Sequence, residues 1–288
     1  MTYTLILGDR TYSSWSLRGW LLFEKFGIPA DTKFVDFSSR DVADQLSKYA
    51  PARTVPTVVT PEGAIVSDTL AIAEELATRH PKAGLWPGDP KLRATARAAT
   101  AEMHSSFGAL RSECPMHLGQ AYVNAPVSEG VSDDLRRLET IWAHARELSY
   151  GPWLFGDYSV ADAFFAPVAA RIAGYGLEVN EFAADYVARH LADTAFRQWR
   201  AMGLVGDTAL PWYVKSYRTT TWPGPKPLRG KAIETGEPEN TACPYSGQPV
   251  THLAEIEGRI FGFCNAFCRD KTVADAEAFP AFMDVYRS

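Results

Sequence analysis

A polar run between a strand-like segment and a helix-like segment constrains the fold of this chain more than any other feature. Residues 3–7 (YTLIL) are rich in β-branched and aromatic side chains and end at Gly8, as a strand does. Apolar residues then recur at helical spacing over residues 17–26, and Gly27 supplies a stop signal. The run YSSWSLR at residues 12–18 therefore lies where a helix begins, beside unpaired backbone N–H groups and the positive end of the helix dipole.

The hydroxyls of this run, on Ser13, Ser14 and Ser16, have two candidate roles. A hydroxyl at a helix start can cap the helix, or it can donate a hydrogen bond to an anionic ligand such as a thiolate. Position alone favours the cap, because serine is a preferred N-cap residue.

A second signal is the proline at the mouth of a short apolar segment, residues 54–59 (TVPTVV). Proline within a sheet is tolerated only at the first position of a strand, at an edge or at a bulge, so Pro56 marks an entry or an exposed edge. A cis Val55–Pro56 bond would aim the backbone N–H and C=O of Val55 outward, toward a peptide-like ligand.

A third signal is a second helix start, at Asp68 and Thr69, directly after the strand-like residues 64–67. The two side chains are suited to holding a carboxylate and an amine. The alternative is an ordinary helix cap formed by Ser67 or Asp68.

The order of these segments resembles the thioredoxin-like domain of glutathione transferases. The strand, serine-rich helix start, Val-Pro strand and Asp-Thr helix start follow one another as in that family, and YSSWSLR is most similar to its serine-type bacterial and zeta-like members. The resemblance implies an α/β thioredoxin-like domain over residues 1–80 and a homodimer.

The resemblance also implies a role for each site residue. Ser13 would contact the glutathione sulfur, with Ser14 and Ser16 as the alternatives. Val55, beside Pro56, would pair with the cysteinyl backbone of glutathione, and Asp68 and Thr69 would bind its γ-glutamyl end. Arg53 would be a further contact, at a position where relatives carry a basic or amide residue. Zeta-type isomerases show Ser-Ser-Cys, whereas Trp15 occupies the cysteine position here, which argues against maleylacetoacetate isomerase activity.

Thiol chemistry explains why a serine suits the start of this helix. An unperturbed thiol has a pKa of about 8.5, so only a few per cent of it is thiolate at neutral pH. A hydroxyl donor and the helix dipole lower that pKa and enrich the nucleophile without a general base. Because the serine supplies only part of this effect, its loss should reduce the activity and not abolish it.

Composition is compatible with an enzyme of the cytoplasm. The chain has 288 residues, of which 46% are hydrophobic, enough for more than one compact core. Its net charge of −5 argues against nucleic-acid binding, and no apolar segment is long enough to cross a membrane. Four cysteines in such a chain indicate free thiols or metal ligands, not a disulfide scaffold.

Residues 90–215 are predicted to form an all-helical domain, with long helical runs over residues 91–123 and 128–150. Ser159-x-x-Asp162 resembles a capping box, which we interpret as structural. By the family resemblance, the electrophile would bind between the two domains. Residues on candidate helices facing the first domain are His104, Phe107, Arg111 and Tyr122. Arg111 could bind an anionic substrate there or form a surface salt bridge.

The end of the chain departs from the family plan. Residues 216–238 contain prolines and glycines and are predicted to be an extended linker. Residues 239–288 carry Cys243, Cys264 and Cys268 in a C-x20-C-x3-C pattern. This segment resembles the small treble-clef-type modules called YHS or TRASH, which implies a metal site, with zinc as the candidate. A closed zinc site needs four ligands, and Ser246 stands where a fourth cysteine would be expected. The alternative is a small core in which the cysteines are merely packed.

The sequence therefore predicts a glutathione transferase, in which glutathione thiolate attacks an electrophilic small molecule. Within the same fold, the alternatives are a glutathione-dependent isomerase or peroxidase. From a different class, the alternative is a non-catalytic protein that binds glutathione or a partner.

Overall fold

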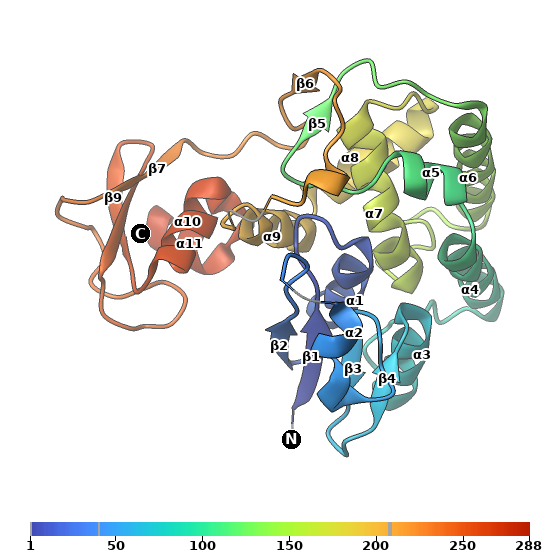
Figure 1. The fold of residues 1–288 in the computed structure, drawn as a ribbon, viewed down its shortest axis with the longest axis horizontal. Helices are drawn as coiled ribbons and strands as arrows, with labels where there is room; N and C mark the ends of the chain where they lie inside the picture. The colour runs from blue at the N-terminus through green and yellow to red at the C-terminus, as the bar shows by residue number, and fades with distance from the viewer. Residues whose placement is uncertain (1, 40, 207–208) are drawn as a thin grey trace. The chain divides into compact units, whose positions relative to one another are not determined.

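The computed structural model of the chain describes residues 2–39, 41–206 and 209–288 (Figure 1). The chain divides into two compact units, one made of Met1–His190 with Ala209–Pro223 and the other of Leu191–Thr208 with Gly224–Ser288. Within the described residues, no helix combines the length and the apolar character that crossing a membrane requires.

The first unit begins with a four-stranded mixed sheet in the order β2-β1-β3-β4. β1 pairs with β2 in parallel, and β3 pairs antiparallel with both β1 and β4. The elements of this part are β1 (Tyr3–Leu7), α1 (Ser14–Glu24), β2 (Ala30–Phe34), α2 (Val42–Gln45), a 3₁₀ turn (Ser47–Tyr49), β3 (Thr57–Val59), β4 (Ile65–Ser67) and α3 (Thr69–Arg79). The predicted thioredoxin-like α/β domain is thereby confirmed.

Helix α1 is held on this domain by its apolar face. Leu17, Leu21 and Leu22 are fully buried, and each such side chain contributes about 1.5–3 kcal/mol when it leaves water. Gly19 lies between them and permits a close approach, because a Cβ at this position would stand 2.7 Å from the ring of Pro56. The start of α1 is therefore fixed beside the Val55–Pro56 segment.

The rest of the first unit is mainly helical, as predicted. Its elements are α4 (Pro90–Ser105), α5 (Gly108–Glu113), β5 (Ala121–Tyr122), α6 (Glu129–Leu148), α7 (Val160–Tyr175), α8 (Glu181–Ala192, whose last two residues belong to the second unit), a 3₁₀ turn (Pro211–Tyr213) and β6 (Thr219–Thr220). Nearly all of α7 is buried, and the capping box of Ser159 and Asp162 at its start is confirmed. The helical run predicted over residues 91–123 is divided, because Phe107 adopts a left-handed conformation (φ 61°) that ends α4 before α5 begins. Its last part is wrong, since residues 114–123 are not helical and contain β5.

The second unit is built on an antiparallel sheet in the order β7-β8-β9. Its elements are α9 (Thr194–Gly203), β7 (Gly230–Ile233), β8 (His252–Ile256), β9 (Arg259–Phe263), α10 (Ala266–Ala274), a 3₁₀ turn (Ala276–Ala278) and α11 (Pro280–Arg287). Phe261, Phe263 and Phe282 fill its core. Helix α9 comes from the range expected for the helical domain, and β7 from the range expected for the linker; both belong to this unit.

Candidate functional site

Two of the three serines close helix α1. Ser13 is the N-cap: its Oγ accepts a hydrogen bond from the Ser16 backbone N–H at 3.2 Å and donates one to Ser16 Oγ at 2.8 Å. Ser16 Oγ in turn accepts the backbone N–H of Gly8 at 2.8 Å. Ser13 is only 5% exposed and Ser16 is fully buried. The hydroxyls of both residues are therefore already used within the protein.

The third serine is differently placed. Ser14 is the first residue of α1 and is half-buried. Its Oγ accepts a hydrogen bond from Nη2 of Arg171, a buried residue of α7, at 3.3 Å. Within the described part of the chain, the Ser14 hydroxyl hydrogen has no acceptor, so it can be donated to a ligand.

The Val55–Pro56 segment lies beside this helix start. The bond is cis, the form that the sequence analysis considered, and Pro56 directly precedes β3. Val55 is half-buried, and its side chain approaches Gly8, the residue that also bonds Ser16. Arg53 is exposed at the outer side of the same segment.

The second predicted helix start, at Asp68 and Thr69, has a strained backbone at Asp68 and a Thr69 hydroxyl without a hydrogen-bond partner among the described residues. Asp68 has a φ of 81°, which is costly for a residue other than glycine and clusters at ligand sites. Its Oδ1 accepts the backbone N–H groups of Leu70 (2.8 Å) and Ala71 (3.3 Å), while Oδ2 lies 3.0 Å from His104 Nε2. Thr69 is 1% exposed, and its Oγ1 has no hydrogen-bond partner within the described residues.

Positive charge gathers around the serine run. Arg18 of α1 and Arg171 of α7 are both buried, and Arg111 of α5 is half-buried. Burial, followed by repulsion from the other two guanidiniums, lowers the pKa of Arg18 well below its usual value. Burial likewise lowers the pKa of Arg171 to about 10. Sequence reasoning missed Arg18 and Arg171; the only signal was a basic residue on an otherwise apolar helix face.

Only two of the four residues expected to line an electrophile pocket, His104 and Arg111, are recorded in contact with the ring of Trp15. His104 and Arg111 both contact Trp15, at ring and guanidinium distances of 5.2 and 4.6 Å. Phe107 is buried. Tyr122 packs instead against the rings of Tyr175 and Tyr217.

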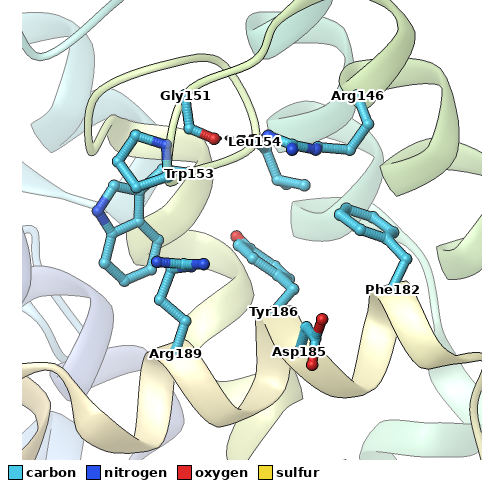
Figure 2. A pocket seen from close by; sticks show the side chains of 9 residues that line it. Arg146, Gly151, Trp153, Leu154, Phe182, Asp185, Tyr186 and Arg189 are labelled. Atoms are coloured by element: carbon cyan, nitrogen blue, oxygen red, sulfur yellow. Dashed lines mark hydrogen bonds between the residues drawn. The ribbon is translucent and has the colours of Figure 1, made fainter.

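A separate small pocket of about 100 Å³ lies between the loop after α6 and the start of α8 (Figure 2). Trp153 and Leu154 come from the loop, and Phe182 and Tyr186 come from α8. Its lining contains none of the predicted glutathione-binding residues. The hydroxyl of Tyr186 donates to the Asp162 carboxylate at 2.8 Å, so this pocket borders the α7 cap.

The second unit brings its three cysteines together. The Sγ atoms of Cys243, Cys264 and Cys268 all lie within 4.8 Å of one another. Burial raises the pKa of the Cys243 thiol, but donors that include the backbone of Tyr245 and Cys264 outweigh it and lower this pKa to about 7. Burial, reinforced by Cys243, raises the pKa of Cys268 to about 12.

A fourth ligand does not join this thiol cluster among the described His, Cys, Asp and Glu side chains. Ser246 Oγ hydrogen-bonds Cys264 Sγ at 3.3 Å. His252 is engaged with Thr251, and Asp270 pairs with Arg269. Three deprotonated thiols can hold a soft metal ion, with one coordination position left open.

Comparison with known proteins finds similarity to one family. Residues 12–79 match the family model described as "Glutathione S-transferase, N-terminal domain". The chain is 34% identical over 182 residues to a probable maleylacetoacetate isomerase from Caenorhabditis elegans, which covers 60% of this chain and 80% of that protein.

Solved structures with the same fold include two glutathione transferases. A homologue from Burkholderia GL BGR1, with bound glutathione, has a TM-score of 0.54 and 24% identity, and covers 72% of this chain and 100% of that chain. Glutathione transferase Omega 2S from Trametes versicolor has a TM-score of 0.55 and 21% identity, and covers 74% of this chain and 99% of that chain.

Proposed function

Because this chain belongs to the glutathione S-transferase family, we propose that it forms glutathione thiolate at the start of α1 and directs it at an electrophilic small molecule. The observation that carries the proposal is that one domain holds three groups able to bind a ligand. They are the hydroxyl of Ser14, whose hydrogen has no acceptor among the described residues, the half-buried Val55 before β3, and the buried hydroxyl of Thr69, which has no partner there.

Glutathione is bound along these groups. The γ-glutamyl end lies at Asp68 and Thr69, where a carboxylate accepts the Thr69 hydroxyl and the α3 N-terminus adds its dipole. The cysteinyl backbone pairs with the backbone of Val55 beside Pro56. Arg53 remains a proposed glutathione contact on the exposed side.

Ser14 is the serine that we assign to the sulfur. The family resemblance points to Ser13, but the Ser13 hydroxyl is used by the helix cap and Ser16 stands behind it. Ser14 has a hydrogen to donate, and its oxygen is held by Arg171. Lowering the thiol pKa by about two units, which corresponds to about 2.7 kcal/mol, makes thiolate the main form at neutral pH.

The reaction balances without any further reagent. The thiol proton passes to solvent when glutathione binds, and the sulfur lone pair forms the new S–C bond. A leaving group then departs with its bonding electron pair, or the π electrons of an activated double bond move outward and the product takes a proton from water.

The test is conjugation of glutathione to a panel of electrophiles. Ser14→Ala should lower kcat/KM by about 10- to 100-fold and raise the pKa of the bound thiol, read from the ultraviolet absorbance of its thiolate. Ser13→Ala should act mainly on stability, by about 1 kcal/mol. Ser47→Ala, an exposed serine of the same domain, serves as the control. Failure of the full chain to bind glutathione and to turn over any electrophile would refute the proposal.

Glutathione-dependent isomerisation is the second candidate function, because the C. elegans relative is named a probable maleylacetoacetate isomerase. Trp15 stands at the cysteine position of the zeta-type motif, which argues against this function. Isomerisation of maleylacetoacetate by the purified chain, in the presence of glutathione only, would favour it. Glutathione binding without turnover of any substrate would favour the non-catalytic alternative.

For the tail we propose a metal site at Cys243, Cys264 and Cys268, with zinc as the candidate ion, in a YHS/TRASH-like module. The mutual approach of the three Sγ atoms and the lowered pKa of Cys243 support it. The full chain should take up one zinc ion and release protons as it does so. Cys264→Ala should abolish uptake, whereas Cys114→Ala, a buried cysteine of the first unit, should leave it unchanged. A chain that takes up no metal would refute the site.

Two further assignments are proposals of a different kind. Assembly as a homodimer rests on the family resemblance alone, and residence in the cytoplasm rests on the composition of the chain. Sedimentation of the purified chain tests the first, and fractionation of the source cells tests the second.

A further inference from the structure

Arg18 is a buried cation that forms no ion pair with any residue that the structure describes. It is 2% exposed, and its Nε and Nη1 have no hydrogen-bond partner within the described residues. Its guanidinium lies 4.6 Å from the ring centroid of Trp15 and 5.1 Å from that of Phe164. Buried charges are normally paired, because an uncompensated one is costly.

Arg111 approaches the same indole ring from the helical part of the unit. Its guanidinium also lies 4.6 Å from the Trp15 centroid. Only Nη1 has partners among the described residues, the backbone carbonyls of His104 (3.2 Å) and Ser106 (3.4 Å). Because Arg111 is half-buried, its remaining N–H groups can reach a ligand.

The acid whose charge acts on Arg18 already has partners. Attraction by Asp68 opposes, but does not reverse, the lowering of the Arg18 pKa, and the two oxygens of Asp68 serve the α3 cap and His104. Across residues 2–39, 41–206 and 209–288, neither Arg18 nor Arg111 forms an ion pair. Each of the three nitrogens of Arg171 already donates one hydrogen bond, to the carbonyls of Cys114 and Pro167 and to Ser14 Oγ.

We propose that the electrophile taken by this chain carries a carboxylate, which Arg111 binds directly while the buried charge of Arg18 attracts it, with the reactive part of the molecule against Trp15. This inference rests on the proposed function and adds the chemical class of the second substrate. Trp15 follows Ser14 in the chain, so a molecule held on this ring stands next to the proposed thiolate.

The charges explain what such a site gains. A thiolate and a carboxylate repel each other, which slows the attack of glutathione on an anionic electrophile. Two guanidiniums beside the indole offset that repulsion, and Arg18 does so without screening by water. A neutral electrophile makes no use of them.

The test compares two probes that differ only in charge, 4-chloro-3-nitrobenzoate and 4-chloro-3-nitrobenzamide. In both, sulfur replaces chloride, which leaves with its bonding pair. Arg111→Gln should lower kcat/KM by about 10- to 100-fold for the benzoate, mainly through KM, and by less than about twofold for the benzamide. Arg111→Lys should recover part of the loss, because it keeps the charge without the planar fork. Arg136→Gln, at a residue 67% exposed on α6, is the control.

Arg18→Met is the second variant, because it removes a buried charge at nearly constant shape. It should lower the benzoate rate selectively, by about 5- to 10-fold, and leave the glutathione Kd unchanged. Equal losses for both probes would overturn the inference. A rise in the glutathione Kd in both variants would overturn it as well, by assigning the arginines to the carboxylates of glutathione while leaving the proposed function intact. A wild-type chain that neither binds glutathione nor converts either probe would refute the proposed function and this inference together.

Discussion

Two helices of the first unit, α7 and α3, begin with buried polar side chains, and they differ in whether their hydrogen bonds are complete. At the start of α7, both oxygens of Asp162 are used. Oδ2 accepts from the backbone and hydroxyl of Ser159, at 2.9 and 3.0 Å. Oδ1 accepts from the hydroxyl of Tyr186 at 2.8 Å and from the backbone N–H of Leu154 at 3.3 Å. Both oxygens of this carboxylate therefore have their hydrogen-bond partners within the protein.

At the start of α3 the hydrogen bonds are incomplete. Asp68 caps the helix in a strained conformation, but the neighbouring Thr69 hydroxyl is buried without a partner. Arg18 is likewise buried, and its Nε and Nη1 have no hydrogen-bond partner within the described residues. An unsatisfied buried polar group costs about 1–3 kcal/mol, which a bound ligand can return.

The number of hydrogen bonds made by the polar side chains separates a structural cap from a binding site at these two helix starts. Both helices start with the same kinds of residue, and in sequence each matches a cap. The separation comes from the partners that distant parts of the chain supply, such as Tyr186 for Asp162. A buried polar side chain whose donors and acceptors all have partners indicates a structural role, and one without a partner indicates a ligand site.

The largest effect is expected from removing the complete hydrogen-bond network at the start of α7. Asp162→Ala should lower the free energy of unfolding of the first unit by about 3–5 kcal/mol, because four donors lose their acceptor in a buried place. Urea unfolding followed by circular dichroism measures this change. Asp157→Ala, at an exposed residue of the same loop, should change the free energy by less than about 0.5 kcal/mol. A small effect of Asp162→Ala would show that the network is not structural.

The charge of the same carboxyl provides a second test, through pH. Burial raises the pKa of Asp162 to about 6 from its usual 3.8, although hydrogen bonds from Tyr186 and Ser159 oppose the shift. Between these values the folded chain keeps a proton that the unfolded chain has lost. The stability contributed by this proton is therefore full below about pH 4 and is lost as the pH rises through about 6, a total of about 3 kcal/mol.

This pH effect is measured as a difference between two proteins. The free energy of unfolding of the wild type, minus that of Asp162→Asn, should fall over the stated pH window, because asparagine does not titrate there. The subtraction removes the contribution of every other titrating group that the two proteins share. A difference that stays constant with pH would contradict the raised pKa.

The sequence predicted those features that depend on neighbouring residues. The first strand, the helix start at the serine run, the helix start at Asp68 and Thr69, and the capping box are confirmed. The division of residues 91–123 was not predicted, because Phe107 gives no local signal for a left-handed conformation. A bulky aromatic residue holds that conformation only where the surrounding structure imposes it.

The candidate site was predicted only in part, for a related reason. Ser14 and Thr69 lie in motifs, whereas the arginines come from α1, α5 and α7 and meet only through tertiary packing. Arg111 was named as a candidate anion ligand, but the ring that it shares with Arg18 could not be foreseen. Whether a hydroxyl already has a hydrogen-bond partner is likewise a property of the folded chain, since the partner can come from residues far away in sequence.

The smallest effects are expected from removing one hydroxyl at each of the two helix starts, Thr69 at α3 and Ser159 at α7. Thr69→Val replaces an unpartnered hydroxyl by a methyl group of the same shape, so the ligand-free chain should gain about 1 kcal/mol of stability. The same change should weaken glutathione binding about tenfold, measured by calorimetry, because the hydroxyl meets the γ-glutamyl carboxylate. Ser159→Ala removes a hydroxyl that donates to Asp162 and should do the reverse, with a loss of about 1 kcal/mol and an unchanged glutathione Kd. If Thr69→Val instead lowers stability and leaves the Kd unchanged, the Thr69 hydroxyl is structural, and an unfinished hydrogen bond does not mark the ligand in this fold.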